Sequence, residues 1–340
     1  MLAVGWGGYL TSVSLAQQII DKIHAEGRTL IRYWAHPNWA SVYTDHNKDF
    51  NKAIADALVE RATQYGMDVL LDFNHYLPED FHIMTTSVDN STAWINNAVT
   101  IGSYYKNNSN VILEPICEDS SPSLVGWSTF KPKLNALLSA LRAAGINNRV
   151  IIDWGWTSWG WPSGLETLND SNYGLARHLY LSSPWDAIPQ STPTTLESMK
   201  NRVLVSGSST TTLQSMMNNY FYNFNNVYVQ GAKHLTPPPP LGFWIDGSGP
   251  SAASGSPYLI TPTPTGLAYV MLMIRECIAN NVPFCTYRFG PGTEDVMNTY
   301  QNLAIQYFGE TMFPSSKPQG KWVFNHWQDG DINPIKTINL

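Results

Sequence analysis

Short apolar segments alternate along the chain with longer segments in which apolar residues recur at helical spacing. The short segments are rich in Val, Ile and Leu, which is typical of strands buried on both faces of a parallel sheet. The predicted strands are Leu2–Trp6, Thr29–Trp34, Met67–Phe73, Val111–Ile116, Val150–Trp154, Ala176–Leu181, Gly242–Asp246 and Val282–Tyr287. A closed barrel of alternating strands and helices has this number of strands.

Amphipathic patterns in the gaps between these segments predict the helices. They cover Leu15–Ala25, Phe50–Tyr65, Thr92–Tyr105, Phe130–Ala144, Gly266–Asn280 and Asp295–Phe308. Gly66 and Gly145 directly follow two of them, where a helix stop is expected. Strict alternation implies right-handed crossovers and a parallel sheet. We therefore predict an α/β fold, a (β/α)8 TIM barrel, as a single domain over residues 1–340.

The alternation is interrupted before the seventh predicted strand, over about residues 187–240. This interval contains a small polar run at 206–212 and four consecutive prolines at 237–240. We expect an insertion that carries a helix, has room for a strand, and closes on a stiff polyproline spacer. A C-terminal extension, about residues 309–340, is expected to pack across the outside of the barrel.

Composition narrows the choice of partners. Hydrophobic residues make up 43% of the chain, charged residues only 14%, and the net charge is −6, which argues against nucleic acid or an anionic membrane. No apolar run is long enough to span a bilayer. The neutral polar surface is typical of extracellular or cell-surface proteins, and the first residues show no signal peptide. The oligomeric state stays open.

The fourth predicted strand supplies the first candidate for chemistry. It ends in the sequence Ile116-Cys117-Glu118-Asp119, which places carboxylates at the strand end where such barrels hold their catalytic groups. Glu118 is therefore the candidate catalytic acid. Glu114, four residues earlier, is expected to act either as a structural partner of Arg32 or in catalysis.

Several strand ends together resemble the retaining glycoside hydrolases built on a β/α barrel, most closely glycoside hydrolase family five, which holds cellulases and mannanases. The residues that carry the resemblance are Arg32 on strand two, Asp72-Phe73-Asn74 and His75 after strand three, Cys117-Glu118-Asp119 after strand four, His178-Leu179-Tyr180 on strand six and Tyr287 on strand eight. In the family the fourth strand ends in Asn-Glu-Pro with Glu as acid/base, so the resemblance gives Glu118 that role. It implies that Arg32, Asn74, His75, His178, Tyr180 and Tyr287 contact the substrate.

The family's nucleophile is a Glu at the end of strand seven, and this chain has none there. The segment reads Gly242-Phe243-Trp244-Ile245-Asp246-Gly247. In one register Asp246 takes the nucleophile position, and in the other Gly247 takes it and the carboxylate is missing. A slip of one residue moves a side chain to the other face of a strand, so only the first register supports catalysis.

The two registers lead to two functional hypotheses. With Glu118 and Asp246 as a pair, the chain is a retaining glycosidase of a β-linked polysaccharide, a β-1,4-glucan or mannan, and its carboxyl groups stand about 5 to 5.5 Å apart. A gap above about 6.5 Å would fit an inverting mechanism. Without the nucleophile, the chain is an inactive carbohydrate-binding barrel.

Tryptophans provide the candidate sugar platform. Trp154 and Trp156 open a glycine-spaced tryptophan run after strand five, and Trp34 ends strand two. Apolar sugar faces stack on indole rings, although core packing must account for many of the 13 tryptophans. The histidines show no zinc spacing and Gly5–Gly8 lacks the dinucleotide pattern, so no metal or cofactor is predicted. Besides the oligosaccharide or polysaccharide substrate, no partner is indicated.

Overall fold

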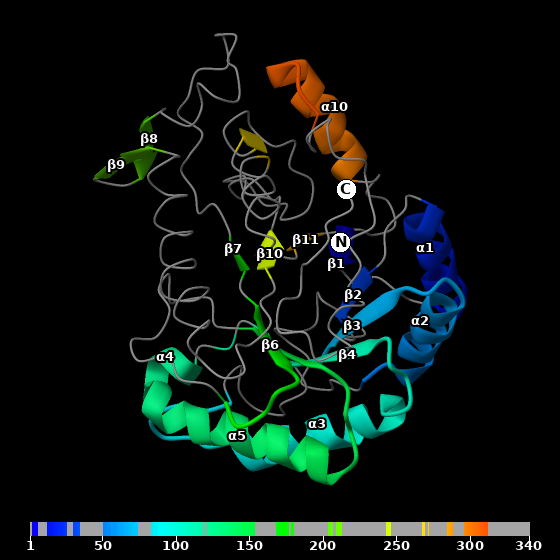
Figure 1. The fold of residues 1–340 in the computed structure, drawn as a ribbon. Helices are drawn as coiled ribbons and strands as arrows, with labels where there is room; N and C mark the ends of the chain where they lie inside the picture. The colour runs from blue at the N-terminus through cyan, green and yellow to red at the C-terminus, as the bar shows by residue number, and fades with distance from the viewer. Residues whose placement is uncertain are drawn as a thin grey trace.

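Parallel strands form one sheet at the centre of the protein (Figure 1). In this computed structural model the described residues are 2–5, 12–25, 30–34, 50–73, 83–117, 119, 121–153, 168–176, 178–179, 203–206, 209–212, 243–245, 267–268, 271, 284–287 and 296–311. The strands of this sheet are β1 (Leu2–Gly5), β2 (Leu30–Trp34), β3 (Asp68–Asp72), β4 (Val111–Ile116), β5 (Val150–Asp153), β6 (Tyr173–Ala176), β7 (His178–Leu179), β10 (Phe243–Ile245) and β11 (Phe284–Tyr287). Their order is β6-β5-β4-β3-β2-β1-β11-β10-β7.

The sixth strand position of the predicted barrel is shared by β6 and β7, which are separated by one residue, Arg177. β6 pairs with β5, from Val150 with Tyr173 onward, whereas β7 pairs with β10 through Trp244 with His178. The two edges of the sheet are thus formed by strands that follow each other in the chain. Counted as one strand they give the eight strands of the predicted barrel, and the fold class is confirmed.

Helices cover the outside of the barrel. They are α1 (Val13–Ala25), α2 (Lys52–Gln64), α3 (Ser91–Tyr105), α4 (Ser121–Val125), α5 (Trp127–Ala143) and α10 (Val296–Phe308). The side chains between helices and sheet form one apolar core, and every residue of β4 is buried. Gly102 lets α3 come close to β4, because a Cβ there would stand 3.2 Å from Leu113 Cδ1 and 3.1 Å from Ile146 Cδ1.

The helix bounds follow the predicted ones within a few residues wherever the predicted helix is described. Gly66 and Gly145 have φ values of 64° and 72°, the left-handed conformation that a side chain disfavours, so both end their helices as expected. α4 was not predicted, since five residues are too few to show helical periodicity. Of the predicted helix at Gly266–Asn280, only residues 267, 268 and 271 are described.

Two further strands, β8 (Val203–Ser206) and β9 (Ser209–Thr212), lie inside the interval predicted as an insertion. They form an antiparallel hairpin in a sheet of their own. The limits of the insertion and its predicted helix lie outside the described residues and stay predictions. The same holds for the C-terminal extension beyond residue 311.

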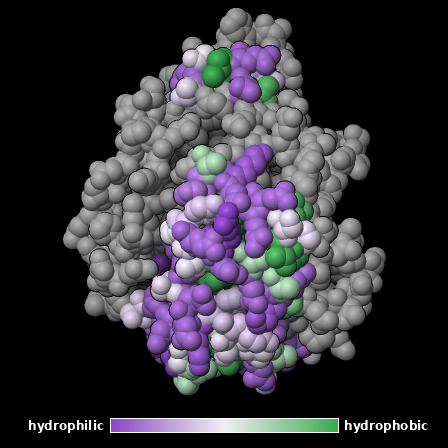
Figure 2. All heavy atoms as spheres, turned by 90° about the vertical axis from the view of Figure 1, so that its right-hand side faces the viewer, coloured by the Kyte–Doolittle hydropathy of each residue, from purple (hydrophilic) through white to green (hydrophobic). Residues whose placement is uncertain are grey.

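The outer surface of α1 and α2 is strongly polar (Figure 2). A shallow groove between these helices is lined by Ser14, Gln17, Gln18, Asp21, Glu60, Arg61 and Gln64. Arg61 binds Asp21 through Nε at 2.6 Å and so ties α2 to α1. No helix within the described part of the chain has the length and apolar character needed to cross a membrane.

Candidate active site

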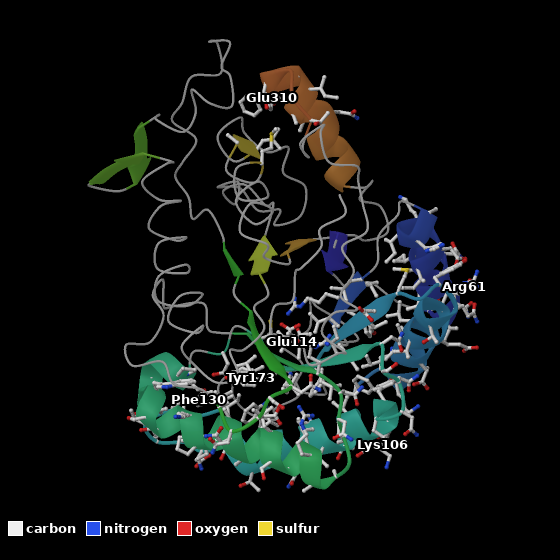
Figure 3. All side chains as sticks on the ribbon, viewed as in Figure 1. Arg61, Lys106, Glu114, Phe130, Tyr173 and Glu310 are labelled. Atoms are coloured by element: carbon white, nitrogen blue, oxygen red, sulfur yellow. The ribbon has the colours of Figure 1, made fainter. Side chains whose placement is uncertain are left out.

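A buried cluster of polar side chains lies near the carboxyl ends of β2, β3 and β4. Asp72 is the last residue of β3 and pairs in register with Glu114 of β4. Arg32 of β2 pairs with Leu70, two residues before Asp72, and Cys117 directly follows β4. Figure 3 shows Glu114 among the strands, whereas Arg61 lies on an outer helix. Parallel strands bring these residues to one end of the barrel, the end that holds the active site in such folds.

The Arg32 guanidinium holds this cluster together. Its Nε donates to Glu114 Oε2 at 2.7 Å, and its Nη2 donates to Glu114 Oε1 at 2.8 Å. The same Nη2 donates to Asp72 Oδ2 at 2.5 Å and approaches Cys117 Sγ at 2.9 Å. A forked, two-point contact of this kind fixes the orientation of both groups. Glu114 is therefore a structural partner of Arg32, one of the two roles that the sequence indicated.

Burial makes the cluster electrostatically strong. Arg32 is 6% exposed, Cys117 is 2% exposed, and Asp72 and Glu114 are fully buried. Burial by itself lowers the pKa of Arg32, but Cys117, Glu114 and Asp72 together raise that pKa well above its ordinary value. The guanidinium therefore stays charged. Because its partners are buried, water competes little for their hydrogen bonds to Arg32.

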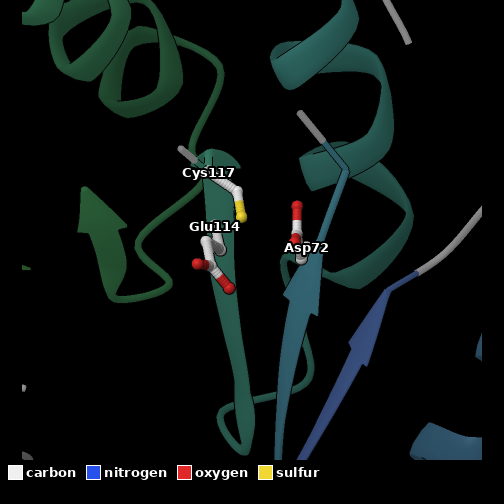
Figure 4. Close-up of side chains that lie close together, drawn as sticks. All are labelled: Asp72, Glu114 and Cys117. Carbon is white, nitrogen blue, oxygen red and sulfur yellow. The ribbon is translucent and has the colours of Figure 1, made fainter. Parts of the chain in front are cut away.

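Figure 4 shows Asp72, Glu114 and Cys117 side by side at the ends of β3 and β4. One ligand atom from each lies within 4.8 Å of the others, as a metal ion would require. Arg32 Nη2 contacts all three side chains, so the guanidinium already stands where a cation would be placed. The arrangement therefore fits the charged Arg32 side chain better than a bound metal ion.

Pro115 explains how β4 presents this cluster. A proline has no N–H to donate, and the pairing of β4 with β5 shifts register between Leu113 and Ile116. The Pro115 carbonyl accepts a hydrogen bond at 2.6 Å from Nε1 of Trp94, a buried residue of α3. The strand continues through the proline, and its irregularity falls in the part of β4 that carries Glu114.

The other predicted site residues divide into two groups. Trp34 ends β2, Tyr287 ends β11, and His178 lies in β7, so their backbones are placed at the carboxyl ends of their strands. The remaining predicted residues lie outside the described part of the chain; they are Glu118, Asp246, Asn74, His75, Trp154, Trp156 and Tyr180. Their roles stay predictions.

Two described residues of this region were not assigned a role from the sequence. Asp72 ends an apolar strand, and that position was the available signal for a residue at the barrel mouth. Asp119, 2% exposed, accepts hydrogen bonds from the backbone N–H groups of Ile83 and Ser121. The Asp119-Ser120-Ser121 sequence allows the local bond, but the bond to Ile83 depends on the fold.

Comparison with known proteins decides the family. The model of the cellulase family, glycosyl hydrolase family 5, matches residues 3–229. This chain belongs to that family. The match begins within β1, includes β2 to β9 and the segment Cys117-Glu118-Asp119, and ends before β10 and Asp246. No curated protein matches the chain significantly.

Solved structures of the cellulase family share the fold. Thermotoga maritima Cel5A, solved with a mannotriose substrate, superposes with a TM-score of 0.55 at 16% identity, covering 86% of this chain and 90% of its own. Pseudomonas stutzeri endoglucanase Cel5A gives 0.57 at 14%, with 86% of each chain covered. An endocellulase from Pyrococcus horikoshii gives 0.56 at 12%, covering 89% of this chain and 91% of its own. At these identities the likeness shows the barrel fold.

Proposed function

We propose that this glycoside hydrolase cleaves a β-1,4-linked glucan or mannan, with Glu118 as the general acid/base. The observation that carries the proposal is the carboxylate two residues after the end of β4 in a chain of the cellulase family. Its neighbours support the role, since Cys117 contacts Arg32 and Asp119 accepts two backbone hydrogen bonds. The backbone on both sides of Glu118 is thereby held at the barrel mouth, where a general acid has to meet the departing sugar oxygen.

We further propose a retaining mechanism with Asp246 as the nucleophile. Asp246 directly follows β10, whose last residue Ile245 pairs with Thr286 of β11 and with Leu179 of β7. In such a mechanism one carboxyl group protonates the leaving oxygen and the other attacks the anomeric carbon, with the two about 5 to 5.5 Å apart. An aspartate is one methylene shorter than the family's glutamate, so the sugar must bind closer to the end of β10.

The Arg32 cluster suits this mechanism as a rigid support. It joins β2, β3 and β4 through buried charge-assisted bonds, and it ends one residue before Glu118. A reacting group has to be held to within a fraction of an ångström, because misplacement by 1 Å is enough to lower a rate about 100-fold. We assign to Arg32, Asp72 and Glu114 the role of holding Glu118 in position.

The sugar is expected to meet aromatic and polar side chains at the same end of the barrel. We assign this contact to Trp34, Asn74, His75, Trp154, Trp156, His178, Tyr180 and Tyr287. Stacking of sugar faces on the indoles and hydrogen bonds to hydroxyl groups are the expected interactions. A polysaccharide substrate also agrees with an extracellular location, which we retain as part of the proposal.

Release of reducing ends from β-1,4-glucan and β-1,4-mannan tests the proposal. The parent protein should hydrolyse one of them, and Glu118→Gln should lose that activity while still binding the corresponding oligosaccharide, because an amide keeps the shape but cannot act as a general acid. Glu60→Gln, the same change at an exposed position of α2, is the matched control and should retain full activity. A parent that binds an oligosaccharide but releases no reducing ends would favour the inactive carbohydrate-binding barrel.

A further inference from the structure

The loop after β3 and the loop after β4 are joined by a pair of buried polar side chains. Asp119 Oδ2 accepts the N–H of Ile83 at 2.9 Å, and Oδ1 accepts the N–H of Ser121 at 2.6 Å. Ser121 Oγ accepts the N–H of Met84 at 2.7 Å. Asp119 is 2% exposed and Ser121 is fully buried. We call these two side chains and the backbone groups they bind the Asp119 clip.

The clip is a strong contact for its size. A carboxylate is expensive to bury unless its oxygens accept hydrogen bonds, and here each oxygen accepts one backbone N–H. Such charge-assisted bonds are roughly twice as strong as neutral ones. In the family pattern that the chain resembles, proline occupies this position, and a proline side chain accepts no hydrogen bond. The clip is therefore a device of this chain.

We propose that Asp119 is a positioning residue for Glu118, an inference that rests on the proposed function. Glu118 is joined by one peptide bond to Asp119 and by another to Cys117, which contacts Arg32 at 2.9 Å. Consecutive Cα atoms across a trans peptide bond are about 3.8 Å apart, so anchoring both neighbours confines the backbone that carries Glu118. Loss of the clip releases one of the two anchors.

Asp170 provides a matched control at the opposite end of the barrel. Its Oδ1 accepts the N–H of Asn172, two residues later, at 2.6 Å, the same local bond that Asp119 makes to Ser121. Its Oδ2 binds Arg142 of α5 at 2.8 Å, and its side chain is 7% exposed. Asp170 precedes β6, so it lies at the amino ends of the strands, away from the barrel mouth.

The test compares Asp119→Ala, Asp119→Asn and Asp170→Ala in the full chain. Two substrates are used: the polysaccharide that the parent hydrolyses, and the 2,4-dinitrophenyl β-glycoside of its disaccharide. Dinitrophenolate leaves without help from an acid, so its first release, unlike cleavage of the polysaccharide, does not depend on a well-placed Glu118. Hydrolysis of the glycosyl-enzyme uses Glu118 as the base with either substrate, so the rate of this first release is measured rather than steady-state turnover. We expect Asp119→Ala to lower kcat on the polysaccharide about 10- to 100-fold with KM within about threefold, and to release the first equivalent of dinitrophenolate nearly as fast as the parent. Asp119→Asn, which keeps one acceptor oxygen, should recover part of the loss.

Asp170→Ala should lower the melting temperature and leave kcat on both substrates unchanged. Full kcat of Asp119→Ala on the polysaccharide, or an equally large fall in the rate of the first dinitrophenolate release, would overturn the positioning role. If Asp119→Ala does not fold, Asp119→Asn, which exchanges one of the two acceptor oxygens for an amide nitrogen, takes its place, and a selective loss of polysaccharide turnover, smaller in size, is required of it. A parent without turnover removes the proposed function itself, whereas an active parent with a fully active Asp119→Ala removes the clip alone.

Discussion

Two buried or half-buried arginines lie at opposite ends of the barrel, and their pKa values are shifted in opposite directions. Arg32, near the carboxyl ends of the strands, has its pKa raised well above the ordinary value because Cys117, Glu114 and Asp72 outweigh the effect of burial. Arg149, directly before β5, has its pKa lowered to about 9, since burial outweighs its attraction to Asp68. The comparison teaches that the opposite charges facing a buried arginine, and not its burial alone, decide the direction in which its pKa shifts.

The largest expected effect follows from removing each arginine in turn. Arg32→Met leaves two fully buried carboxylates without their cation, and we expect a loss of about 3–5 kcal/mol in the free energy of unfolding, measured in urea. Arg149→Met should cost about 1 kcal/mol or less, since Asp68 is able to take up a proton. Equal losses in the two variants would show that the extra partners of Arg32 contribute nothing.

Asp68, the partner of Arg149, makes the stability of the folded protein depend on pH. Burial raises its pKa from 3.8 to about 6, and the opposing attraction of Arg149 is smaller. The folded protein therefore binds a proton more tightly than the unfolded chain between these values. The contribution of Asp68 to stability is fully present below pH 3.8 and is lost as the pH rises through about 6.

The variant Asp68→Asn has no such proton to lose. Its stability relative to the parent should rise by on the order of 1–2 kcal/mol between pH 4.5 and pH 7, measured by urea unfolding at both pH values. A difference between variant and parent that stays constant with pH would contradict the raised pKa. A difference that falls with pH would mean that attraction to Arg149 dominates after all.

Two buried tyrosines show whether a partner also matters for an uncharged buried group. Their replacement is expected to change the free energy of unfolding least. The Tyr33 hydroxyl, on β2, has no hydrogen-bond partner among the described residues, and burial raises its pKa. The Tyr173 hydroxyl, on β6, accepts the N–H of Leu168 at 3.1 Å. Tyr33→Phe should leave the free energy of unfolding unchanged or raise it by up to about 1 kcal/mol, whereas Tyr173→Phe should lower it by about 1 kcal/mol. Thermal unfolding of the two variants side by side measures both; a clear loss in Tyr33→Phe would reveal a partner.

The barrel was predictable because its strands are buried on both faces and therefore read as continuous apolar runs. β4 begins and ends as predicted, at Val111 and Ile116. The sixth strand begins at Tyr173 rather than at the predicted Ala176. The prediction missed this start because Tyr173 and Gly174 lack the aliphatic character of the other strands. In this sheet its first residues are required to pair with β5, and that requirement leaves no mark in the local sequence.

Only the site residues that lie in or at the end of an apolar strand could be predicted from the sequence. The pairing of Arg32 with Glu114 was one of two expected roles, since a charged residue inside an apolar strand needs a partner. The sharing of the same guanidinium by Asp72, 40 residues away in the sequence, depends on strand register. The bond from Ile83 to Asp119 likewise joins residues 36 apart and arises from the packing of two loops.

The account depends most on Glu118 as the general acid, and one kinetic measurement tests that role directly. Glu118→Gln is mixed with the 2,4-dinitrophenyl β-glycoside, and dinitrophenolate is followed from the first milliseconds. A retaining enzyme without its acid/base still forms the glycosyl-enzyme from this substrate but hydrolyses it slowly. We predict a rapid burst of about one equivalent per protein molecule followed by slow turnover, together with loss of polysaccharide hydrolysis. Parent-like hydrolysis of the polysaccharide, or loss of the burst in a folded variant, would contradict the assignment.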